Sequence, residues 1–111
     1  MDFTSEYIEI NDKTYTIFIG RSAKGNEQII KMSHPESLWF HLNNISSAHI
    51  ILESNGDDIP KRYINKVASK LFEYKTNIPN NINIIYTKVK NVKLTNSLGT
   101  VIPTNTKLIK F

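Results

Sequence analysis

Apolar residues in this 111-residue chain occur in short runs typical of strands and at the three-to-four-residue spacing typical of helices. Together these patterns limit the chain to short strands around two helices. Most apolar runs are short and rich in β-branched or aromatic residues, which favours strands. Too few helical segments separate these runs for a doubly wound parallel sheet. We therefore predict an α+β fold: a single domain over residues 1–111 with a mostly antiparallel sheet of six to seven strands and two helices, in the order ββαββαβββ.

The chain is expected to begin with a β-hairpin. β-rich runs at 7–10 and 14–19 flank a polar segment at 11–13, whose turn-forming residues suit a hairpin loop of three to five residues. Gly20 ends the second run and opens a loop.

A short helix and two central strands are predicted next. We expect Asn26 to cap the helix and Pro35 to end it by about Ser33. The segments at 38–42 and 48–52 are the most apolar runs of the chain, so they are predicted to be central strands.

The second helix is the clearest element. Pro60 suits its first turn, and Asp57 or Asp58 suits its cap. Apolar residues then recur at helical spacing and predict a buried face made of Tyr63, Ile64, Val67, Ala68, Leu71 and Phe72. Its outward face carries a basic stripe one turn apart, formed by Arg62, Lys66 and Lys70.

The remaining residues predict more strands. A strand at 83–87 leads into an extended stretch at 88–93. A last antiparallel pair is predicted at 100–102 and 107–111, joined by a turn at 103–106.

The net charge of +4 hides a strong polarity. Residues 1–60 contain four Lys or Arg against nine Asp or Glu, whereas residues 61–111 contain ten against one. Such asymmetry indicates a polyanionic partner. The alternative is that A/T-rich codons supply the lysines and that they form only a solvated face.

Arg21 is a candidate phosphate ligand. It follows a predicted strand and precedes a predicted helix, where free backbone N–H groups favour an anion. Arginine also binds phosphate bidentately. The alternative is a surface ion pair with Glu27 or Glu36.

Six further basic residues are candidate nucleic-acid contacts, in two groups: Arg62, Lys66 and Lys70 on the helix, and Lys88, Lys90 and Lys93 on the extended stretch. Tyrosines that could stack on bases are interleaved with them, namely Tyr63, Tyr74 and Tyr86. The two groups would have to share one surface for their charges to act together.

The hypothesis that the protein is an enzyme rests on His41 and His49, which lie on neighbouring predicted strands. The nearest acids, Glu36 and Glu53, lie beyond the strand ends. The chain has no cysteine, Walker A, H-E-x-x-H or G-x-S-x-G motif. We therefore expect no enzyme activity, no metal and no cofactor.

No apolar run approaches the length of a membrane span, since the longest is Ile50–Leu52. The N-terminus lacks the basic start and apolar stretch of a signal peptide. These features predict a cytoplasmic protein that does not cross a membrane.

Five ordered blocks resemble the NFACT-R domain family, and specifically its standalone eukaryotic branch. They cover nearly the whole chain and are the segments at 20–27, 38–42, 46–52, 85–93 and 99–101. The Trp-Phe-His and Ser-Ser-Ala-His sequences within them are most similar to the eukaryotic branch. The chain departs from the family at Ser37, where an acidic residue is usual, and at Leu94, where the family has a second lysine.

The resemblance implies a module that contacts RNA. In multidomain relatives, this module works with tRNA on the large ribosomal subunit during rescue of stalled nascent chains. The positions that match the family pattern are Gly20, Arg21, Asn26, Trp39, His41, Ser47, His49, Tyr86, Lys90, Lys93 and Gly99.

The leading hypothesis is therefore a non-catalytic module that binds nucleic acid, RNA rather than DNA, with tRNA or ribosomal RNA as ligand and a link to ribosome-associated quality control. The runner-up is a protein-interaction module that docks on a ribosomal or other protein through its acidic first half. A hydrolase built on His41 and His49 is the third hypothesis.

Overall fold

The computed structural model describes all residues from 1 to 111, and it begins with a long hairpin. Strand β1 (Phe3–Ile10) pairs antiparallel with β2 (Lys13–Gly20). The turn contains only two residues, Asn11 and Asp12, and both have positive φ. Asn and Asp tolerate this conformation, which gives the type I′ geometry that matches strand twist. The predicted loop of three to five residues was therefore too long.

Six strands form the main sheet, and every pair is antiparallel. The other four strands are β3 (Leu38–Leu42), β4 (Ile50–Leu52), β5 (Ile84–Lys88) and β8 (Lys107–Ile109). The order across the sheet is β1-β2-β4-β3-β5-β8, so β3 and β4 are central, as their apolar sequences predict.

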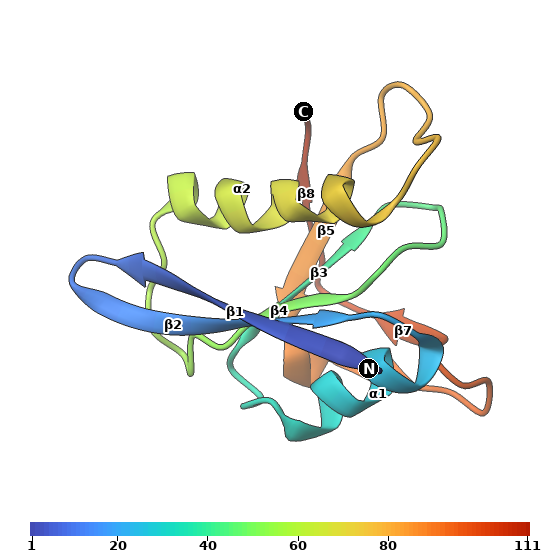
Figure 1. Ribbon diagram of the computed structural model, residues 1–111, viewed down its shortest axis with the longest axis horizontal. Helices are drawn as coiled ribbons and strands as arrows, with labels where there is room; N and C mark the ends of the chain where they lie inside the picture. The colour runs from blue at the N-terminus through green and yellow to red at the C-terminus, as the bar shows by residue number, and fades with distance from the viewer.

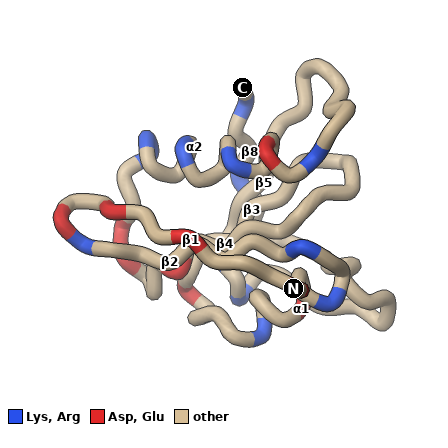
Figure 2. Tube along the Cα trace, in the orientation of Figure 1, with Lys and Arg blue, Asp and Glu red and all other residues tan.

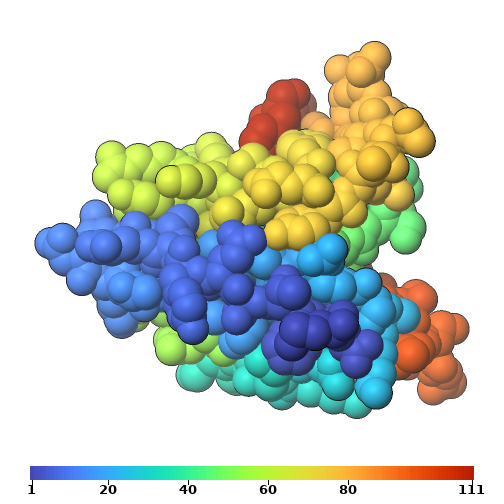
Figure 3. Space-filling model, viewed as in Figure 1, coloured from blue at the N-terminus to red at the C-terminus, as the bar shows by residue number.

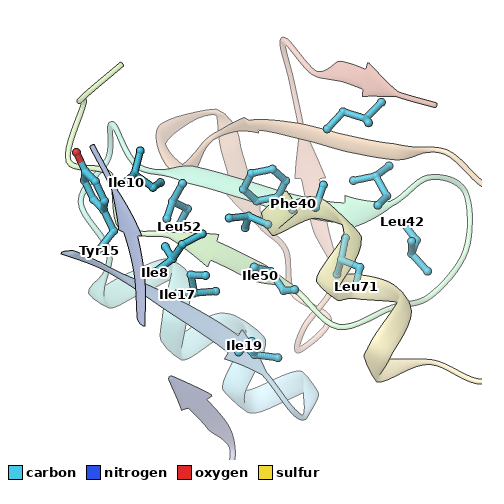
Figure 4. Packing of buried hydrophobic residues seen from close by; sticks show 14 residues of the cluster. Ile8, Ile10, Tyr15, Ile17, Ile19, Phe40, Leu42, Ile50, Leu52 and Leu71 are labelled. Atoms are coloured by element: carbon cyan, nitrogen blue, oxygen red, sulfur yellow. The ribbon is translucent and has the colours of Figure 1, made fainter. Parts of the chain in front are cut away.

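The two α-helices lie on opposite faces of this sheet (Figure 1). Helix α2 (Lys61–Ser69) continues into a 3₁₀ helix, η1 (Lys70–Tyr74), and packs Val67, Ala68 and Leu71 on the larger cluster of buried residues (Figure 4). Helix α1 (Ala23–Met32) covers the smaller cluster on the other face. Neither helix has the length and apolar character that would let it traverse a lipid bilayer.

The start of α1 differs from the expectation. Ser22, with extended backbone, is the N-cap, and its Oγ accepts a hydrogen bond from Gly25 N at 3.0 Å. Asn26 therefore lies inside the helix, where it is buried. The C-terminal end matches the prediction, because the helix stops at Met32.

No side chain caps α2 at its N-cap, Pro60. The carboxylate of Asp57 instead accepts hydrogen bonds from Lys13 Nζ at 2.6 Å and Tyr15 Oη at 2.7 Å. The acidic residue thus ties the loop before α2 to the first hairpin.

The pairing of the last strands contradicts the sequence prediction. After a 3₁₀ turn, η2 (Val89–Asn91), strand β6 (Val92–Leu94) pairs with β7 (Val101–Pro103) as a separate two-stranded sheet. Strand β8 joins the edge of the main sheet beside β5. Burial explains the difference, because Ile109 lies opposite Ile84 in the α2-side core, whereas β7 packs on the α1 side. The α+β class and its mostly antiparallel sheet are confirmed.

Candidate nucleic-acid interface

A groove of about 650 Å³ opens on the α1 side of the sheet. Its floor is formed by β3, by Ile85 of β5 and by His49, which directly precedes β4. Its walls are the first turn of α1, the connection at 43–47 and the segment at 98–101, which leads into β7. In Figure 3, the connection before β7, in orange, projects at the right edge of the molecule beside the light-blue start of α1. No lysine, arginine, aspartate or glutamate lines the groove. Both polar and apolar side chains line its walls, but none of them is charged.

Three aromatic side chains lie together at the floor. Trp39 and His49 are 1% and 2% exposed, and Trp39 Nε1 donates a hydrogen bond to His49 Nδ1 at 3.1 Å. The half-buried His41 ring stacks on Trp39 with centroids 5.5 Å apart and planes at 13°. The His41 and His49 rings meet edge to face at 5.0 Å. The predicted approach of the two histidines across neighbouring strands is confirmed.

Both imidazoles are neutral at pH 7. Burial lowers the pKa of His49 to about 3, with the nearby His41 as a smaller cause, and burial also lowers the pKa of His41. Because His49 Nδ1 accepts from Trp39, its proton is on Nε2. His41 Nδ1 lies 2.5 Å from Leu42 O and so carries the proton of that ring.

Gly20 and Asn26 hold the floor against α1. Asn26 Oδ1 accepts a hydrogen bond from His49 N at 3.2 Å, and Gly20 N donates to His49 O at 2.8 Å. A Cβ on Gly20 would overlap Asn26 Oδ1. The close approach of strand and helix therefore requires glycine at this position.

Ser47 and Gly99 hold the two walls. Ser47 Oγ accepts from Leu42 N at 3.1 Å and fixes the 43–47 connection. Gly99 has φ +79, and its N–H donates to Glu27 Oε2 at 3.1 Å, which ties the other wall to α1. A Cβ on Gly99 would lie 2.7 Å from the Cα of Ala23.

The groove thus gathers six of the positions that matched the family pattern: Asn26, Trp39, His41, Ser47, His49 and Gly99. Ser46 belongs to the Ser-Ser-Ala-His block, but the sequence did not indicate Asn43, Asn44 or Leu98 as wall residues. The two asparagines look like ordinary loop residues, and the exposed Leu98 lies in a segment without a strand or helix signal.

The two groups of basic candidates lie on opposite sides of the sheet. The stripe of Arg62, Lys66 and Lys70 belongs to α2 and η1, which cover one face (Figure 2). Lys90 and Lys93 belong to η2 and β6, whose valines pack in the α1-side cluster. The two groups therefore do not converge on one surface.

Several of the candidate lysines are ion-paired. The carboxylate of Glu36 binds Lys88 Nζ at 2.6 Å and Lys90 Nζ at 2.7 Å. Hydrogen bonds from Lys88 and then from Lys90 lower the pKa of Glu36 to about 2. On the other side of the sheet, Lys70 Nζ lies 3.0 Å from Glu6 Oε1. These three positive charges are partly offset in the free protein.

Arg21 is exposed and forms neither of the two ion pairs weighed for it. Its guanidinium lies over the ring of Tyr74, 5.0 Å from the centroid, while Glu27 is paired with Lys31 and Glu36 with two other lysines. Arg62 lies similarly over Tyr63, 4.9 Å from the ring centroid.

The three candidate tyrosines are occupied within the fold. Tyr86 stacks on Phe40, with centroids 5.6 Å apart, and Tyr63 packs against the α2-side core. Tyr74 Oη donates to Glu6 Oε2 at 2.9 Å. The stacked rings that line the groove are instead Trp39 and His41.

The groove offers little for hydrolysis. It contains two neutral imidazoles without a carboxylate, and no three His, Asp or Glu side chains are grouped to hold a metal ion. Its arrangement of stacked rings, amides and hydroxyls is suited to binding a flat, uncharged group.

Comparison with known proteins shows similarity over nearly the whole chain. The profile of the NFACT protein RNA binding domain matches residues 3–110. Coiled-coil domain-containing protein 25 of Mus musculus is 37% identical over 99 residues, which cover 84% of this chain and 47% of that protein. The chain thus spans about half the length of the eukaryotic relatives it matches.

A more distant relative is the Rqc2 homolog RqcH of Streptococcus pneumoniae, 33% identical over 70 residues, which cover 62% of this chain and 12% of that protein. Among solved structures, the C-terminal part of the fibronectin/fibrinogen-binding protein from Streptococcus suis has a TM-score of 0.80 at 20% identity. The match covers 96% of this chain and 43% of that chain, and it shows the same fold.

Proposed function

This chain belongs to the NFACT protein RNA binding domain family, and from that membership we propose that it binds RNA on the α1 side of its sheet without catalysing a reaction. The proposed setting is the cytoplasmic translation machinery. A relationship to the Rqc2 homolog RqcH supports a role linked to ribosome-associated quality control, with the ribosome as partner and tRNA or ribosomal RNA as ligand.

One observation carries this proposal. Six positions that match the family pattern, far apart in the sequence, line one uncharged groove. Ser47 and Gly99 hold its two walls, and Asn26 holds the floor against α1. The other three, Trp39, His41 and His49, form its aromatic floor. A family whose shared feature is RNA binding would be expected to preserve the groove that contacts the RNA.

The proposed phosphate contacts lie outside this groove. Arg21 lies just before α1, with its guanidinium over Tyr74 of η1. Lys88 at the end of β5 and Lys90 in η2 lie beside Glu36, just before β3, and Lys93 lies in β6. The stripe of Arg62, Lys66 and Lys70 faces the other way, so it would contact only an RNA large enough to reach round the molecule, such as tRNA or ribosomal RNA. Contacts of this kind are insensitive to base sequence.

A salt titration with a short single-stranded RNA tests the proposal. Affinity should fall as salt rises, with a slope of log K against log[salt] that shrinks by about 0.7 for each phosphate contact removed. The variant with both Lys90→Ala and Lys93→Ala, which removes two charges from η2 and β6, should bind more weakly and with a shallower slope. The matched control is the variant with both Arg62→Ala and Lys66→Ala, which removes the same charge from α2 and should bind the short RNA as the wild type does.

Salt-independent binding, or equal losses in the two variants, would contradict the proposed surface. If the chain does not bind RNA, and a protein partner stays bound to it after nuclease treatment, the protein-interaction alternative is favoured.

A further inference from the structure

We propose that the groove over Trp39, His41 and His49 is a pocket for one unpaired nucleobase of the bound RNA. This inference rests on the proposed RNA binding and adds to it a site for the base. It distinguishes the groove, which would hold the base, from the lysines and arginines outside it, which would hold phosphates.

Stacking provides the first argument. Trp39 and His41 are two residues apart on β3, so both side chains project on the α1 face, and their rings are nearly parallel. The stack runs along the strand from the buried Trp39 to the half-buried His41, and the groove continues past His41 to Asn43 and Asn44. A planar ring inserted there would be the third member of the stack. Base–aromatic stacking is the interaction that proteins use to bind single-stranded RNA.

Charge provides the second argument. The groove lining contains no ionised side chain, and both of its histidines are neutral at pH 7. A phosphate would lose its hydration there without a cation in return. A nucleobase is planar and uncharged, and its polar edge could reach the amides and hydroxyls of Asn43, Asn44 and Ser46.

Size and restraint provide the third argument. The volume of about 650 Å³ is within the range of pockets that hold small organic ligands, about 300–1,000 Å³. Both walls are fixed to the body of the fold, one by Ser47 Oγ on Leu42 N and the other by Gly99 N on Glu27 Oε2. A pocket with fixed walls loses little conformational entropy when a ligand enters.

The test compares an eight-nucleotide single-stranded RNA with an abasic oligonucleotide of the same length and with an RNA duplex, all binding to the full chain. The wild type should prefer the single strand over the abasic oligonucleotide by about 5- to 150-fold, the range expected for stacking of one base. His41→Ala should remove this preference and leave duplex binding unchanged. His41→Phe, which keeps the ring, should retain the preference. Trp39 is the only tryptophan, so its fluorescence reports both base entry and intact folding of each variant.

Equal affinities for the single strand and the abasic oligonucleotide would overturn the base pocket, while their salt dependence would still support RNA binding. Loss of the preference in His41→Phe as well as His41→Ala would also overturn it, because the stacking surface would not be the cause. If neither RNA nor the abasic oligonucleotide binds, both this inference and the proposed function are wrong.

Discussion

Asn26 shows how a residue can be identified correctly and given the wrong role. The sequence singles it out twice, as a helix cap and as a position of the family pattern. In the structure Ser22 is the cap, and the Asn26 amide accepts a hydrogen bond from the backbone of His49, just before β4. Both residues are good caps, so local propensity could not choose between them. The choice depends on a contact 23 residues away in the sequence.

Glu36 forms ion pairs with two of the proposed phosphate contacts, so its substitution is predicted to strengthen RNA binding rather than weaken it. Glu36→Gln removes the carboxylate that binds Lys88 and Lys90. Both ammonium groups then become available to phosphate, so affinity for single-stranded RNA should rise, and the salt slope should steepen by up to about 1.4. A salt titration of binding measures both quantities.

Glu9→Gln is the matched control, because Glu9 is an exposed acid of β1 that forms no ion pair in the structure. It changes the net charge equally and should have a much smaller effect. Equal gains in the two variants would mean that only net charge matters and that Glu36 restrains nothing.

The buried histidines predict that the fold loses stability in mild acid. Their pKa values are lowered in the folded state, so the unfolded chain binds protons first as pH falls below about 6.5. The stabilisation is complete above that pH and is lost progressively towards pH 3. For His49 alone, the free energy of unfolding should drop by about 2 kcal/mol between pH 7 and pH 5.

Urea unfolding at the two pH values measures this loss. The carboxylates with lowered pKa values, such as Glu36, stay ionised in both the folded and unfolded chain over most of this window, so they do not mask the effect. Unchanged stability between pH 7 and pH 5 would show that His49 is not held neutral by burial.

At the scale of elements, most of the fold follows from local pattern. Alternating residues predict the first hairpin, apolar runs predict β3 and β4 at the centre, and helical spacing predicts the buried face of α2. The last strands do not follow, because the turn-like segment at 103–106 suggests a hairpin that does not form. Which strands pair depends on the core that buries Ile109, and no local pattern contains that information.

Adjacent residues of β8 test this pairing. Ile109 is 7% exposed against the α2-side core, whereas Leu108 is 48% exposed on the opposite face. Ile109→Ala should lower the free energy of unfolding by about 2–5 kcal/mol, and Leu108→Ala by well under half of that. Chemical denaturation of both variants measures the difference. Similar costs for the two substitutions would contradict the placement of β8 in the main sheet.

At the scale of the whole molecule, the fold divides the basic residues of the second half of the sequence between the two faces of the sheet. The basic second half supplies both α2 and the η2–β6 segment, and these two elements pack on opposite faces of the sheet. Periodicity shows which side of a helix is basic, but it does not show which face of the sheet that helix covers. The sequence therefore predicted the candidate residues without predicting that they form two surfaces.

The groove arises from the same long-range arrangement. Its residues come from β3, β5, β7, the start of α1 and the connections between strands, so no single segment of sequence describes it. The resemblance to the family identified half a dozen of its positions, because that comparison carries information from the folded site. The uncharged lining and the stacked Trp39 and His41 could be recognised only in three dimensions.

RNA is proposed to bind on the α1 side, over the groove. The most direct measurement is a titration of the isotopically labelled chain with a short single-stranded RNA, followed through the backbone amide NMR signals. We expect the largest shifts at 23–26, 41–49 and 98–101, with little change along α2 at 61–69. Shifts concentrated on α2 would place the RNA on the opposite face and contradict binding over the groove.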